Sequence, residues 1–102
     1  MKELYKIHAE MCKVFSNATR IEMLNLLRDK ELSVTELIRR TRLSQANISQ
    51  HLSIMKAKGI VTSKRRGKNI YYRLENPKII KAFDIIREAL AENLRKRSLL
   101  AS

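Results

Sequence analysis

Several side chains between residues 44 and 50 can both donate and accept hydrogen bonds, in a chain that otherwise covers its surface with charge. They are Ser44, Gln45, Asn47, Ser49 and Gln50, with the small Ala46 among them. Such groups match the donors and acceptors that base edges present in the major groove of DNA. Apolar residues at the spacing of one helix face lie between them: Leu43, Ile48, Leu52 and Met55. We therefore predict a recognition helix that turns its polar face toward DNA bases, with Gln45 and Gln50 as the main readers.

The segment before this helix predicts a second, shorter helix. Ser33 and Glu36 form the S-x-x-E pattern of a capping box, and the helix that they begin is expected to run through Thr41. A three-residue link, 42–44, then leads into the recognition helix, for which Ser44 is the expected N-cap. Two short helices joined this closely indicate a helix-turn-helix.

A hairpin is expected after the recognition helix. Gly59 suits the left-handed C-cap of that helix, and residues 60–66 and 69–74 have the composition of two strands. The turn between them, 66–69, carries basic residues at its tip. This two-stranded hairpin would be the wing of a winged helix-turn-helix.

The charge distribution identifies the class of partner. Between Leu37 and Leu74 there is no acidic residue, whereas ten basic ones occur: Arg39, Arg40, Arg42, Lys56, Lys58, Lys64, Arg65, Arg66, Lys68 and Arg73. The formal charge of the chain is +12, so this segment contributes +10 and the remaining twelve basic and ten acidic residues only +2. A solubilising face normally mixes both signs, so we interpret the segment as a phosphate-binding surface on double-stranded DNA. The residues expected to contact phosphates are Arg40, Arg42, Lys56, Lys64, Arg66 and Lys68.

The two ends of the chain predict further helices. Helical spacing of apolar residues predicts one over 3–15, and Asn17 is the expected N-cap of another that runs to about Lys30. Asn76-Pro77 is a strong start signal for a last helix to about Lys96, with 98–102 frayed. The predicted fold is thus mainly α, a winged helix-turn-helix of five helices and a two-stranded wing in one domain, 1–102.

The first and last helices carry more apolar surface than one small domain can cover. The residues concerned are Leu4, Ile7, Met11, Ile79, Phe83, Ile86, Leu90 and Leu94. We expect a homodimer that buries these residues between two copies. No apolar run approaches the length that spans a bilayer, and a single cysteine excludes an intramolecular disulfide and fits a reducing cytoplasm. The expectation is a cytoplasmic protein without membrane contact.

Several of these segments together resemble the ArsR-type winged-helix repressors. Residues 15–21, Phe-Ser-Asn-Ala-Thr-Arg-Ile, are similar to that family's L-x-D/N-P-T-R-L entry to its second helix, with Ala18 in place of Pro. Residues 43–52 are close to its L-S-Q-S-x-V-S-x-H-L signature, and 58–61 and 66–72 resemble its A-G-L-V and wing patterns. The resemblance covers about residues 5–95. It implies a homodimer that binds an inverted-repeat operator and represses transcription.

The metal sites that the resemblance would imply are not matched. Ser33 and Thr35 occupy the two positions of the C-x-C that binds arsenic, cadmium or lead, and neither supplies a soft ligand. The last helix has Asp84, Glu88 and Glu92 but no His, which the family's other common site requires. We therefore expect no metal and no cofactor, and the effector is unknown.

Some residues allow a second interpretation. Cys12 lies beside the apolar stripe of its helix and is expected to be a buried structural thiol; redox sensing across a dimer axis is the alternative. His51 is expected to pack or to contact phosphate. The three acidic residues of the last helix are expected to pair with Lys81, Arg87, Arg95 or Lys96, and a hard-cation site is the alternative.

Other classes of function are less well supported. An enzyme would need a phosphate loop or a set of catalytic side chains, which this chain lacks, so we expect none. An RNA-binding winged helix would need exposed aromatic residues for stacking, and few are available. A winged helix that binds proteins is the strongest alternative, although the polar recognition face and the basic wing argue against it.

Overall fold

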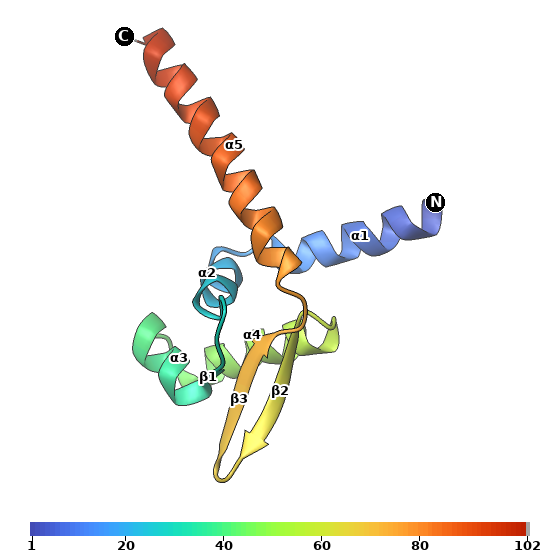
Figure 1. The fold of residues 1–102 in the computed structure, drawn as a ribbon, viewed down its shortest axis with the longest axis vertical. Coiled ribbons are helices and arrows are strands. Elements are labelled where there is room, and N and C mark those ends of the chain that lie inside the picture. The colour runs from blue at the N-terminus through green and yellow to red at the C-terminus, as the bar shows by residue number, and fades with distance from the viewer. Residues whose placement is uncertain (102) are drawn as a thin grey trace.

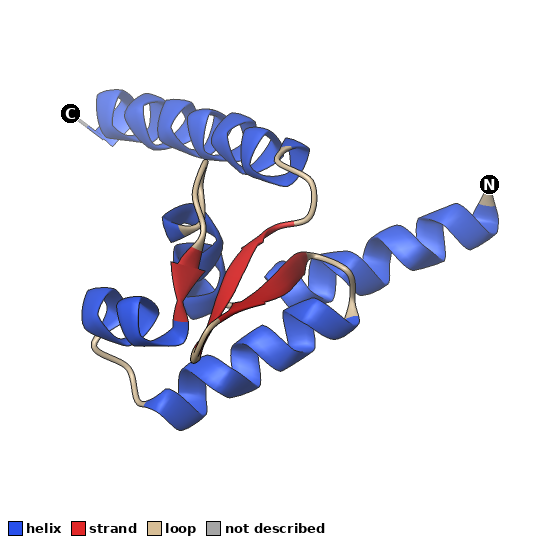
Figure 2. Cartoon of the chain, turned by 60° about the horizontal axis from the view of Figure 1, so that its bottom comes forward, coloured by secondary structure: helices blue, strands red, loops and turns tan. Residues whose placement is uncertain are grey.

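The computed structural model describes residues 1–101 and contains five helices and a small antiparallel sheet (Figure 1). The elements are, in chain order, α1 Lys2–Phe15, α2 Ala18–Leu26, β1 Leu32–Ser33, α3 Val34–Thr41, α4 Gln45–Ala57, β2 Val61–Arg66, β3 Asn69–Leu74 and α5 Lys78–Ala101. In Figure 2, α4 runs below the strands, α3 lies to their left and α5 lies above them. The predicted class, a winged helix-turn-helix of five helices, is confirmed.

Local signals place the helix-turn-helix as expected. The Ser33 hydroxyl accepts a hydrogen bond from the Glu36 backbone N–H at 3.2 Å, and the Glu36 carboxylate accepts one from the Ser33 N–H at 3.4 Å, so both halves of the capping box form. α3 ends at Thr41, and its C-cap, Arg42, takes a left-handed conformation with φ 61°. Ser44 then caps α4 by accepting from the Asn47 N–H at 3.1 Å.

The wing differs from the expectation by one strand. β2 and β3 pair antiparallel through a tight turn in which Gly67 has φ 63°, a left-handed conformation that favours glycine. The two-residue strand β1 adds to the other edge of β3, with Leu32 opposite Tyr72 and Ser33 opposite Tyr71. The strand order is therefore β1-β3-β2. The sheet joins the wing directly to the start of α3.

The hydrophobic core lies where α2, α3, α4 and the sheet meet. Its fully buried side chains are Met23, Leu24, Leu27, Leu37, Ile48, Leu52, Met55, Ile60 and Val61. α5 contributes only its first turns, through Ile80 and Phe83. The Phe83 ring packs edge-to-face on Phe15, with centroids 5.0 Å apart and an interplanar angle of 88°. This pair connects α1 to α5.

Two helix ends differ from the expectation. α2 ends at Leu26 rather than near Lys30, and Asp29 takes a left-handed conformation with φ 57° that turns the chain toward β1. α5 continues to Ala101, so the predicted helix end near Lys96 is wrong; the fraying of 98–102 stays a prediction, and Ser102 lies outside the described residues. The start of α5 is as expected, because Asn76 accepts a hydrogen bond from the Lys78 N–H at 3.0 Å.

Two helices extend away from this body. Figure 1 shows α5 projecting from one end and α1 from another side. The radius of gyration is 16.0 Å, whereas a compact domain of this length has about 13 Å. None of the helices in the described part of the chain is both long and apolar enough to cross a membrane. The protomer is thus elongated because its terminal helices are only partly packed.

Candidate nucleic-acid interface

The outer face of α4 is uncharged from Gln45 to Ser53 and is exposed to solvent. Its inner face is anchored by Ile48, Leu52 and Met55, each at most 1% exposed. The side chains expected to contact DNA are all exposed: Ser44, Gln45, Ala46, Asn47, Ser49 and Gln50. The Ser44 hydroxyl is used as the helix cap, which leaves the amide groups as the better candidates for reading bases.

The start of α4 and the tip of the wing lie on the same side of the molecule. Gln45 lines a cavity of about 240 Å³ together with Lys68, Asn69 and Ile70 of the wing and with Thr35 at the start of α3. Residues separated by more than twenty positions in the chain are therefore brought to one surface. This arrangement would let helix and wing contact one ligand together.

Most of the basic side chains that are expected to contact phosphates are exposed and can reach a ligand. Arg40, Arg42, Lys64 and Lys68 are exposed. Lys56 is also exposed, and its ammonium donates a hydrogen bond to the Ser63 hydroxyl at 2.7 Å, which ties the end of α4 to β2. The basic surface therefore runs from α3 across α4 to the wing, without an acidic residue between 37 and 74.

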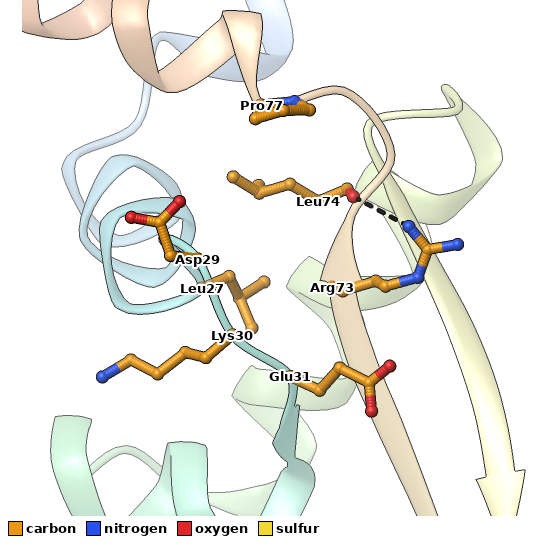
Figure 3. A pocket seen from close by; sticks show the side chains of 7 residues that line it. All are labelled: Leu27, Asp29, Lys30, Glu31, Arg73, Leu74 and Pro77. Carbon is orange, nitrogen blue, oxygen red and sulfur yellow. Dashed lines mark hydrogen bonds between the residues drawn. The ribbon is translucent and has the colours of Figure 1, made fainter.

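Arg66 has partners that the sequence did not indicate. Its guanidinium lies 2.9 Å from the carboxylate of Glu31, and its central carbon lies 5.6 Å from the centroid of the Tyr71 ring. Glu31 also lines a cavity of about 340 Å³ at the sheet edge, together with Arg73, and its side chain points toward β3 (Figure 3). An acidic residue from outside the basic segment thus pairs with one of that segment's own cations.

His51 is half-buried and packs against Arg20 of the same protomer. Its Nδ1 accepts a hydrogen bond from Arg20 Nε at 3.1 Å, and Arg20 also donates to the Val14 carbonyl at 3.2 Å. Partial burial, and secondly the charge of Arg20, lower the pKa of His51 below its ordinary value of 6.5. A neutral imidazole therefore links α4 to α1 and α2, which favours the packing role over a phosphate contact.

The residues expected at a dimer interface fall into two groups. Leu4, Ile7, Ile86, Leu90 and Leu94 are exposed in the protomer. Phe83, in contrast, is only 9% exposed and belongs to the protomer core because it packs on Phe15, while Met11 and Ile79 are half-buried against the same core. Helical spacing could not separate these groups, since it places them on one face. It also missed Tyr5, Ile85 and Leu99, which are exposed as well.

A charge cluster joins the turn after α2 to α5. Asp84 accepts hydrogen bonds from both terminal nitrogens of Arg28, at 2.6 and 2.8 Å, and a third from Arg87 at 3.1 Å. The hydrogen bond from Arg28 is the main cause that lowers the pKa of Asp84. Arg87 was among the expected partners of the acidic residues, whereas Arg28 was not. Among the described residues, no three His, Cys, Asp or Glu side chains converge as metal ligands.

Cys12 is exposed in the protomer, so the expectation of a buried structural thiol is wrong. The thiol borders a largely apolar cavity of about 240 Å³ between α1 and α5, to which Met11, Phe15, Ile79 and Phe83 also contribute. Its position beside the unpacked faces of both terminal helices explains the exposure.

Comparison with known proteins identifies the family. Residues 17–63, from the N-cap of α2 into β2, match the profile of the bacterial regulatory protein, arsR family. The HTH-type transcriptional regulator Rv0081 of Mycobacterium tuberculosis is 34% identical over 95 residues, which cover 92% of this chain and 83% of that protein. The chain belongs to the ArsR family. It is a DNA-binding transcriptional regulator with a winged helix-turn-helix.

Solved structures of similar proteins share the fold of this ArsR-family chain. The crystal structure of Rv0081 superimposes with a TM-score of 0.84 over 92% of this chain and 95% of that one. The homodimeric winged helix-turn-helix DNA-binding domain of Mb0332 from Mycobacterium bovis gives 0.81 at 26% identity, over 91% and 86%. The transcriptional repressor PagR of Bacillus anthracis is 38% identical over 72 residues, which cover 70% of this chain and 72% of that protein.

Proposed function

We propose that this ArsR-family regulator is a homodimeric repressor that binds a two-fold symmetric operator. In this proposal each α4 enters a major groove, and each wing lies against the flanking backbone. The observation that carries it is the exposed, uncharged face of α4 within a segment of ten basic residues and no acidic one. Uncharged amides suit base edges and surrounding cations suit phosphates, so the two kinds of contact are separated as DNA recognition requires.

The exposed apolar residues of α1 and α5 support the dimer. Five of the expected interface residues are each more than half exposed: Leu4, Ile7, Ile86, Leu90 and Leu94. Monomeric soluble proteins rarely expose apolar patches larger than a few hundred Å². A two-fold dimer would bury the same patch of both copies at once, and the M. bovis relative of the same fold is described as homodimeric.

The dimer determines what kind of operator can be bound. Two recognition helices related by a two-fold axis fit half-sites about 34–36 Å apart, which is one turn of DNA. An operator of this kind must be an inverted repeat. Repression is the proposed outcome because PagR, one of the similar proteins, is a transcriptional repressor, and a dimer bound over a promoter would exclude other proteins.

We further propose that no metal ion acts as the effector at the family's two common positions. Ser33 and Thr35 stand where the thiolates would be, and the hydroxyl of Ser33 is already engaged in the capping box. On α5, the carboxylate of Asp84 is held by two guanidinium groups. A cytoplasmic location belongs to the same proposal, because the operator is there.

The proposal is tested by selecting genomic DNA fragments with the purified protein and footprinting the fragments that it retains. An inverted repeat with half-sites one turn apart is the expected result. Replacing Gln45 and Gln50 together with Ala should remove the preference for this operator over an unrelated duplex, since each good base contact contributes about 1–3 kcal/mol of discrimination. Binding of the same variant to the unrelated duplex is the control and should change little. Retained preference in the double variant would contradict the assignment of α4.

A further inference from the structure

Arg66 is folded back over the solvent face of the sheet. In the sheet register Lys64 lies opposite Tyr71, which lies opposite Ser33, so alternate residues of the three strands share a face. Arg66 lies two residues after Lys64 on β2, and Glu31 lies two residues before Ser33, so both belong to this same face. The guanidinium therefore reaches diagonally across β3, over the Tyr71 ring, to the carboxylate of Glu31. Its charge lies over the sheet and away from the tip of the wing.

We propose that Glu31 is an intramolecular competitor for Arg66 that weakens the binding of the wing to DNA. Glu31 holds the guanidinium over the sheet through its Nη1 atom, so Arg66 would have to turn away from Glu31 before its guanidinium could face a phosphate and form a bidentate contact. Glu31 would thus act through Arg66 and would not itself touch DNA. This inference rests on the proposed function, because it assumes that the wing contacts phosphates.

The exposure of the pair indicates how large the effect should be. The side chain of Arg66 is 54% exposed and that of Glu31 is 26% exposed, so the ion pair belongs to the weak, solvent-screened class. Such pairs shift equilibria by about two- to fivefold. The Tyr71 ring adds to the retention of the guanidinium in the folded-back position. The competitor should therefore tune affinity rather than prevent binding.

A double-mutant cycle on duplex DNA separates this coupling from general charge effects. Its variants are Glu31→Gln, Arg66→Ala and the two combined, with a random-sequence duplex of about 30 base pairs as the probe, long enough for a two-site footprint. Glu31→Gln keeps the shape of the side chain and removes one negative charge. Glu75→Gln is the matched control, since it makes the same change of charge at an exposed position beyond the opposite end of β3.

Glu31→Gln is expected to tighten binding by about two- to fivefold per protomer beyond the effect of Glu75→Gln, and this excess should vanish in the Arg66→Ala background. Arg66→Ala should reduce the slope of log affinity against log salt by about 0.9 unit for each lost phosphate contact. The slope reports how many phosphate contacts the protein makes with DNA. If Glu31 had only a structural role, the effect of Glu31→Gln would not depend on Arg66.

Three results would overturn the inference while leaving the proposed function intact. They are weaker binding by Glu31→Gln, an excess that persists without Arg66, and an Arg66→Ala variant with an unchanged salt slope. If the wild-type protein binds no duplex DNA at all, the proposed function fails, and the two failures are thereby distinguished.

Discussion

Replacing Leu90 with Asp should separate the proposed dimer into monomers. Leu90 lies on α5 and is 55% exposed, and Ile86 and Leu94 lie one turn to either side of it. It is absent from the hydrophobic core of the protomer. The substitution should therefore affect assembly and leave the fold of the helix-turn-helix unchanged.

The magnitude follows from the exposed fraction. Fully burying a leucine stabilises by about 1.5–3 kcal/mol, so covering half of Leu90 contributes about 1 kcal/mol per protomer and about 2 kcal/mol per dimer. Complete burial of an unpaired carboxylate costs several kcal/mol in lost hydration. Because position 90 would be only partly covered, we assume a cost of about 1 kcal/mol per protomer there. The total of about 4 kcal/mol corresponds to a dissociation constant raised about a thousandfold.

Sedimentation equilibrium over a range of micromolar concentrations measures this change directly. Lys81→Gln is the control, because it changes the charge by the same amount on the opposite face of α5 and should leave the dimer intact. Far-UV circular dichroism verifies that the helices remain. A Leu90→Asp protein that stays dimeric, or a monomer that retains operator affinity, would refute the assignment of this surface.

Three further outcomes are expected. His51→Gln should reduce the loss of thermal stability between pH 7 and pH 5: because the folded pKa of His51 lies below 6.5, the unfolded chain binds the proton first, and stability falls as pH drops through that range in the wild type. A calorimetric pH series with equal losses in both proteins would contradict the packing of His51 on Arg20. Near-stoichiometric zinc, cadmium, arsenite or lead should not release the protein from its operator, since Ser33 and Thr35 offer no thiolate; metal-dependent release in a fluorescence anisotropy titration would show otherwise. Lys68→Ala should weaken binding to all duplexes alike and flatten the salt dependence by about 0.9 unit per lost contact, and an unchanged slope would place the wing tip away from phosphates.

The helix-turn-helix was predictable because its signals are local. Ser33, Glu36 and Ser44 act on backbone groups within three residues of themselves, so the sequence spacing already contains the geometry. The apolar period that ends at Met55 likewise reports burial within one helix. Because the apolar face of α4 is the buried one, the polar side chains on its opposite face are exposed.

The remaining features depend on contacts that no local pattern contains. Asp84 meets Arg28 across 56 positions of the chain, and Arg66 meets Glu31 only because β1 joins the far edge of the sheet. Two-residue β1 is too short for an alternating pattern to be recognised. Phe83 appeared to belong to an interface because the period of a helix identifies a face but not the partner of that face.

The capping box limits how this chain could acquire a thiolate sensor by mutation. Ser33 is both the last residue of β1 and the N-cap of α3, and its buried hydroxyl accepts from the Glu36 N–H and donates to the Glu36 carboxylate. A Ser33→Cys change would introduce the first metal ligand but replace this hydroxyl by a weak hydrogen-bonding group, at a cost of about 1 kcal/mol. A second change at Thr35 would be needed before any metal could offset that loss. The first step toward metal sensing would therefore lower stability without a gain in function, which gives selection a reason to keep this sequence as it is.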